Sequence, residues 1–140
     1  IGTFRALRAV GRAMGDRTPQ LLSYKAVRYP AMSAFFAHPS RIPYADAVVD
    51  TASLVSNTLI DKGLDASYEL PEPIDPRVPI TIAWGRRDLV LPIYQLPRVR
   101  KLLPHARFIT VPGVGHVPMS DNPELIASIL LAGSEQPDGV

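Results

Sequence analysis

A proline-rich break near the middle of the sequence constrains the fold more than any other feature. Residues 71–76 read PEPIDP, and three prolines in six positions disfavour both a helix and a strand there. The spacing of apolar residues also changes at this point, because it is helical before the break and favours short β-strands after it. We therefore expect two parts, a helical segment over residues 1–70 and an α/β segment over residues 71–140.

Residues 1–70 are predicted to form several short helices, because prolines interrupt an otherwise helical pattern. Near the N-terminus, Arg5, Arg8 and Arg12 lie off to one side of an apolar stripe. That stripe consists of Phe4, Leu7, Val10 and Met14. A second stripe, in a helix expected over residues 43–62 and ended by Gly63, consists of Val48, Ala52, Val55 and Leu59.

Residues 71–140 are predicted to alternate strand and helix. The runs VPITIAW (78–84) and RFITV (107–111) are typical of short strands covered on both faces. A helix over 94–103 separates them, and another helix begins at Pro123 with Asn122 as its cap. The expected buried face of this last helix consists of Leu125, Ile126, Ile129 and Leu130. This order predicts parallel strands joined by a helical crossover.

Two strands are too few for an independent sheet of this buried kind. We therefore expect the second part to be the edge of a larger open α/β sheet whose other strands are not in this chain. The fold class is accordingly predicted as α/β, with parallel strands and flanking helices.

Composition argues against several functional classes. The 140 residues carry 15 Lys or Arg and 13 Asp or Glu, and the net charge of +2 is too weak to suggest a nucleic-acid partner. The absence of cysteine excludes thiolate chemistry in these residues. No apolar run reaches the ~20 residues that span a bilayer, and no residues have convincing metal-ligand spacing. We expect no membrane span, no metal and a cytoplasmic location.

Two titratable residues follow the two predicted strands. Asp88 lies in the loop after the first strand and His116 in the loop after the second. Pockets of open α/β sheets lie just beyond the carboxyl ends of the strands, so both side chains are expected at one rim. A carboxylate that accepts the Nδ1 proton of an imidazole leaves Nε2 free to take a proton from a hydroxyl or a water. We predict such a pair, although each residue alone also fits a turn-capping Asp or a surface His.

The same loops carry a longer pattern. The run WGRRDLVLP at residues 84–92 is followed by VPGVGHVPMSDNPELIASIL at residues 111–130. Together they resemble the C-terminal part of the α/β-hydrolase superfamily, in which a G-x-x-D-x-x-x-P turn carries the triad acid and a G-H loop before the last helix carries the triad base. The resemblance implies that Asp88 is the acid and His116 the base. It also implies that residues 1–70 form a helical cap and residues 71–140 the C-terminal part of the core.

The nucleophile motif of that family is absent from the sequence. No G-x-S-x-G occurs, and none of the nine serines lies between glycines at a strand-to-helix elbow. The oxyanion-hole loop of the family is absent too. Because the sequence begins at Ile1 without an initiator Met, we expect the C-terminal half of a hydrolase, whose N-terminal half of the core supplies the nucleophile. A remnant that cannot catalyse by itself is the alternative.

The helical cap is expected to bind the substrate. Its apolar composition favours a small to medium, largely apolar molecule. Phe35 and Phe36, on a short helix expected between Pro30 and Pro39, are predicted to line the pocket, with core packing as the alternative.

Other polar residues are given simpler roles. His38 is interpreted as a loop histidine and His105 as a solvated one, although His38 also fits a substrate contact from the cap. Arg86 and Arg87 are interpreted as solvated charges, with tuning of the acid or binding of an anionic substrate as the alternatives. Asp121 and Glu124 are interpreted as helix-capping residues rather than as metal ligands.

The sequence thus predicts an esterase- or lipase-like hydrolase that acts without a cofactor. An aspartate-nucleophile relative, such as a haloalkane dehalogenase or an epoxide hydrolase, would keep the same acid and base, as would a carbon–carbon bond hydrolase. A non-catalytic binding protein that retains the fold is the alternative from another functional class.

Overall fold

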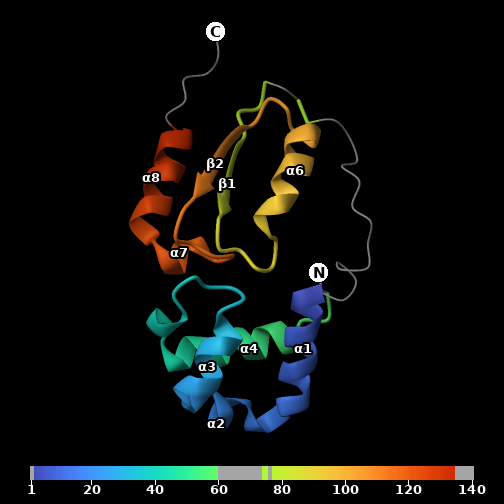
Figure 1. Cartoon of the computed structure of the whole chain (residues 1–140), viewed down its shortest axis with the longest axis vertical. Coiled ribbons are helices and arrows are strands. Elements are labelled where there is room, and N and C mark those ends of the chain that lie inside the picture. The colour runs from blue at the N-terminus through green and yellow to red at the C-terminus, as the bar shows by residue number, and fades with distance from the viewer. Residues whose placement is uncertain (1, 60–73, 76, 135–140) are drawn as a thin grey trace.

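The computed structural model describes residues 2–59, 74–75 and 77–134, which form a helical part and an α/β part (Figure 1). The helical part contains α1 (Gly2–Met14), α2 (Thr18–Ser23), α3 (Lys25–Met32) and α4 (Tyr44–Ser56). The α/β part contains β1 (Thr81–Gly85), α6 (Leu96–Leu102), β2 (Arg107–Val111), α7 (Pro118–Asp121) and α8 (Pro123–Ser134). The predicted boundary after residue 70 lies outside the described residues. The fold is α/β in the coarse sense that helices accompany a small parallel sheet.

Helix α1 contacts the end of α4 through a buried arginine. Arg8 is only 2% exposed, and its Nη2 donates to the carbonyl oxygens of Val55 at 3.4 Å and Asn57 at 2.7 Å. Carbonyl groups at the C-terminal end of a helix lack partners within the helix, so a guanidinium can satisfy them there. The predicted stripe is wrong at Val10, which is 58% exposed, whereas Arg8, which is predicted to lie off to one side of the stripe, is buried.

Helix α4 is shorter than predicted and turned about its axis. It ends at Ser56, and Leu59, the last residue of the predicted stripe, is exposed. The predicted stop at Gly63 lies outside the described residues. The stripe is displaced because the helix packs against the segment that precedes it, which buries Ala47 and leaves Ala52 exposed. The resulting core of the helical part consists of Met32, Phe36, Ile42 and Ala47.

The sheet consists of β1 and β2, which pair in parallel. Thr81 lies opposite Arg107 and Gly85 lies opposite Val111, so both strands end at the same edge. The second strand has the predicted bounds, whereas the first begins at Thr81 rather than Val78. The loops that carry Asp88 and His116 therefore leave the sheet side by side.

Helices cover the two faces of the sheet in part (Figure 1). On one face, Val111 of β2 packs with Ile126 of α8. On the other face, the guanidinium carbon of Arg100 in α6 lies 4.6 Å from the centre of the Phe108 ring. The prediction of strands covered on both faces holds only in part, because Ala83 of β1 is exposed.

Helix α8 begins as predicted but buries a narrower face. The side-chain oxygen of Asn122 accepts a hydrogen bond from the Leu125 amide at 3.1 Å, which satisfies one of the free donors of the first turn. Ile126 is buried, whereas Leu130, predicted to be buried, is exposed. A sheet of two strands covers only part of the apolar face of this helix.

The two loops beyond the sheet contact each other through their backbones. The Arg86 amide donates to the carbonyl oxygen of Val111 and the Arg87 amide to that of Val114, both at 3.0 Å. Gly85 permits this approach, because a Cβ on it would lie 2.7 Å from the Val114 carbonyl oxygen and closer still to that of Gly115. A side chain at position 85 would push the two loops apart.

We expect Gly85→Ala to lower the free energy of unfolding by about 1–3 kcal/mol, the usual cost of overpacking, because backbone carbonyl groups would have to move. Gly133→Ala is the matched control. A Cβ at position 133 would make an ordinary contact, 3.9 Å from Thr81 Oγ1, and alanine is favoured over glycine in a helix by up to ~1 kcal/mol. Urea unfolding measures the stability of both variants and of the wild type. A Gly85→Ala variant as stable as the wild type would contradict the close packing of the two loops.

Candidate functional site

The structure brings Asp88 and His116 together. Oδ2 of Asp88 lies 3.0 Å from Nδ1 of His116. The Asp88 side chain is 8% exposed and that of His116 is 31% exposed, so the carboxylate is buried while the imidazole reaches the surface. The predicted proximity of these two residues is confirmed, and it follows from parallel strands that end at one edge.

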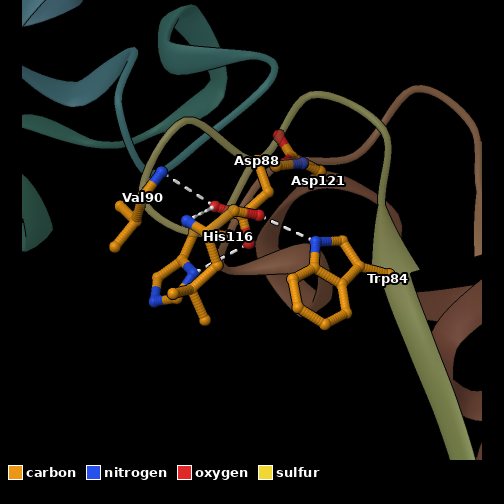
Figure 2. A network of polar contacts seen from close by, with 7 residues as sticks. Trp84, Asp88, Val90, His116 and Asp121 are labelled. Atoms are coloured by element: carbon orange, nitrogen blue, oxygen red, sulfur yellow. Dashed lines mark hydrogen bonds and ion pairs between the residues drawn. The ribbon is translucent and has the colours of Figure 1, made fainter. Parts of the chain in front are cut away.

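Each carboxylate oxygen of Asp88 has a different task (Figure 2). Oδ1 accepts hydrogen bonds from the Val90 amide at 2.9 Å and the Leu91 amide at 2.7 Å. Oδ2 is left for His116. The turn-capping role and the pairing role, which the sequence leaves as alternatives for this residue, are thus both present. The two amide contacts fix the orientation of the carboxylate, so that Oδ2 faces the imidazole.

Trp84, in β1, contacts the loop that carries Asp88. Its indole Nε1 donates to the carbonyl oxygen of Leu91 at 2.7 Å (Figure 2). Leu91 is therefore bound twice, through its amide to Asp88 and through its carbonyl to the last part of β1. The Asp88 loop is thus held by hydrogen bonds within itself, in addition to those of Arg86 and Arg87 to the segment that leads to His116.

The pairing determines which imidazole nitrogen is available for chemistry. A carboxylate accepts hydrogen bonds only, so Nδ1 of His116 carries the proton in this contact. In the neutral ring Nε2 is then the unprotonated nitrogen, and it can accept a proton from a hydroxyl or a water. The negative charge of Asp88 stabilises the imidazolium that forms. Such an arrangement is chemically able to accept a proton at Nε2 while the carboxylate orients the ring.

Phe35 is a residue of the helical part that contacts this pair. Its ring centre is 6.3 Å from that of His116 and 6.5 Å from that of Phe36. Neither phenylalanine lies on the predicted short helix, because α3 ends at Met32 and both residues follow in the turn after it. Pro30 is accommodated inside α3 instead of ending it.

Both phenylalanines line a cavity of about 320 Å³ between the helical part and the His116 loop. The apolar lining consists of Met32, Phe35, Phe36, Leu54 and Val117. The polar lining consists of Asp50, Thr51, Ser53 and Ser120. Phe36 belongs to the buried core as well, whereas Phe35 contacts both the cavity and His116. The cavity thus adjoins the acid–base pair through Phe35.

Asp50 brings a carboxyl group to the wall of this cavity. Partial burial, and secondly the negative charge of Asp46, raise the pKa of the Asp50 carboxyl above its ordinary value. Ionised Asp50 is therefore less favourable in the folded protein than in the unfolded chain. Sequence alone does not mark Asp50 as a cavity residue, because an aspartate in a helical pattern has no local sign of cavity lining.

We expect Asp50→Asn to raise the free energy of unfolding at pH 7 and to leave it nearly unchanged at acidic pH, where the carboxyl is protonated in both states. With a raised folded pKa, the folded protein binds more protons than the unfolded chain between the two pKa values, so stability falls as pH rises through that window. Unfolding curves of wild type and variant across pH measure the difference. A difference in the free energy of unfolding that is independent of pH would show that it does not come from the raised pKa of the Asp50 carboxyl.

Asp121 has a different role from the predicted one. Asn122, not Asp121, caps α8. The Asp121 side chain is buried, and it accepts hydrogen bonds from the amides of Gly115, Ala37 and His38. The amides of Ala37 and His38 belong to a segment far away in the sequence, so no local pattern around Asp121 predicts this role.

The other polar residues considered from the sequence make no side-chain hydrogen bond to the Asp88–His116 pair in the described part of the chain. Arg86 and Arg87 are exposed, and so is His105 on the turn before β2. His38 lies in the loop before the 3₁₀ turn Pro39–Arg41. In residues 2–59, 74–75 and 77–134, no three His, Asp or Glu side chains come together as a metal site would require.

No family model, no curated protein and no solved structure matches the chain. Within the part of the chain that the structure describes, no helix has both the length and the apolar character needed to cross a membrane.

Proposed function

We propose that the protein is an α/β-fold hydrolase in which Asp88 and His116 serve as the acid and the base of a catalytic triad. The observation that carries the proposal is the 3.0 Å contact between Asp88 Oδ2 and His116 Nδ1 beyond the ends of two parallel strands. The loop pattern around both residues, which resembles that of the superfamily, supports it further.

In the proposed mechanism, Nε2 of His116 takes the proton of a nucleophile as the nucleophile attacks the carbonyl carbon of an ester. The proton then passes from Nε2 to the alcohol that leaves, and the acyl group stays on the nucleophile. Nε2 next takes a proton from a water that attacks the acyl carbonyl carbon, and it returns this proton to the nucleophile as the carboxylic acid leaves. Asp88 keeps its negative charge and stabilises the imidazolium formed in each half of the reaction. The proposal assigns the nucleophile and the oxyanion hole to the N-terminal part of a hydrolase core, packed beside β1 and β2.

The cavity supports an apolar substrate of small to medium size. Its volume of about 320 Å³ lies at the lower end of the range for small-molecule sites, and aromatic side chains form part of its wall. The acyl group would enter the cavity beside Phe35 while its carbonyl carbon stays near His116.

We expect His116→Ala to lower kcat for ester hydrolysis by at least ~100-fold in the complete protein, because a general base contributes about 10²–10⁴-fold. Asp88→Asn is expected to be nearly as harmful. Hydrolysis of p-nitrophenyl esters measures both, and His105→Ala is the control because that histidine is exposed on a distant turn. A His116→Ala variant that keeps more than about a tenth of wild-type kcat would contradict the assigned role. It would favour the non-catalytic alternative.

The same assay with other substrates separates the enzyme classes. An aspartate-nucleophile relative would turn over epoxides or haloalkanes instead of esters while remaining dependent on His116. A carbon–carbon bond hydrolase would act on neither set.

We expect Phe35→Ala and Phe36→Ala to have different effects. Phe36 is 5% exposed within the core of the helical part, so its truncation should lower the free energy of unfolding by about 3–5 kcal/mol. Phe35 contacts both the cavity and His116, so its truncation should shift the preferred acyl chain length with a smaller loss of stability. The measurements are kcat/KM for esters of increasing acyl length and denaturant unfolding. An equal loss at every chain length for Phe35→Ala would assign Phe35 to packing alone.

A further inference from the structure

Asp121 has more hydrogen-bond partners than a helix-end aspartate requires. Its carboxylate is 3% exposed. Oδ2 accepts hydrogen bonds from the Gly115 amide at 2.7 Å and the Ala37 amide at 2.9 Å, and Oδ1 accepts one from the His38 amide at 2.9 Å. A buried carboxylate is unfavourable unless donors compensate its charge, and three amides do so here.

The donors belong to two segments that are distant in the sequence. Gly115 directly precedes His116 in the loop after β2, whereas Ala37 and His38 belong to the helical part. The backbone of Asp121 takes part as well, because its carbonyl oxygen accepts a hydrogen bond from Arg41 Nη1 at 3.1 Å. Asp121 therefore connects the His116 loop with the segment between α3 and α4.

The connection leaves no room for adjustment at Gly115. A Cβ on this residue would lie 2.6 Å from the carbonyl oxygen of Phe35 and 2.9 Å from the amide nitrogen of Ala37. On the other side of His116, the Val117 amide donates to the same Phe35 carbonyl oxygen at 3.0 Å. The backbone is thus held immediately before and immediately after His116.

We propose that Asp121 is a positioning residue, whose carboxylate fixes Gly115 against Ala37 and His38 and so keeps the His116 ring in contact with Asp88. The consequence of this position for catalysis rests on the function proposed above. The position of the His116 ring can be measured without turnover.

An asparagine cannot replace this carboxylate. Its amide has one acceptor oxygen, and its NH₂ group would face a backbone N–H that needs an acceptor. Asp121→Asn should thus keep the size of the side chain while freeing at least one of the three amides. Glu124→Gln is the matched control, because it also neutralises a carboxylate close by in the sequence, at an exposed position of α8.

The test is NMR of the ¹⁵N-labelled protein. In Asp121→Asn we expect hydrogen exchange of at least one of the three amides, those of Gly115, Ala37 and His38, to rise at least ~10-fold, as for a lost hydrogen bond to a charged group. We also expect the imidazole nitrogens of His116 to lose part of the Nδ1-protonated form, which a role in stability alone would not change. Glu124→Gln should leave both signals as in the wild type.

Unchanged His116 signals in a folded Asp121→Asn protein would overturn the proposal. Loss of the circular-dichroism signal in that variant would overturn it too, because Asp121 would then support the whole fold. Wild-type protein offers a measurement free of variants: scalar couplings across the hydrogen bonds should link the Gly115 amide nitrogen to the Asp121 carboxyl carbon, and their absence would contradict the contact. If His116→Ala keeps its activity while these NMR results hold, the proposed function fails and the positioning role stands.

Discussion

Backbone contact between the two loops beyond the sheet underlies the rest of the site. The amides of Arg86 and Arg87 bind carbonyl oxygens of the loop that leads to His116, and Gly85 leaves the space for them. With the loops at this distance, a carboxylate on one and an imidazole on the other meet without further adjustment. Parallel register supplies the starting point, because it ends both strands at one edge.

The features predicted correctly from the sequence depend on short stretches of chain. The bounds of β2 follow from one apolar run, and the cap of α8 follows from Asn122 and Pro123 side by side. The proximity of Asp88 and His116 needs only one further step, the parallel order of two strands. Their catalytic role remains a prediction, since proximity does not identify the nucleophile.

The features that sequence reasoning missed depend on partners far along the chain. Arg8 is buried because carbonyl groups 47 and 49 residues away receive its guanidinium. Asp121 is misread as a helix cap because its donors at Ala37 and His38 are 84 and 83 residues away. The exposure of Leu130 has a related cause, since the width of the sheet decides how much of α8 is covered. Periodicity along one helix contains no information of this kind.

The Trp84 contact has a practical consequence. Trp84 is the only tryptophan in the sequence, and its indole binds the loop that carries Asp88. Intrinsic fluorescence excited at the indole therefore comes from a single position at the edge of the candidate site. Changes in emission wavelength or in quenching by iodide would report on any change in the surroundings of that loop. The protein thus contains its own optical probe of this region.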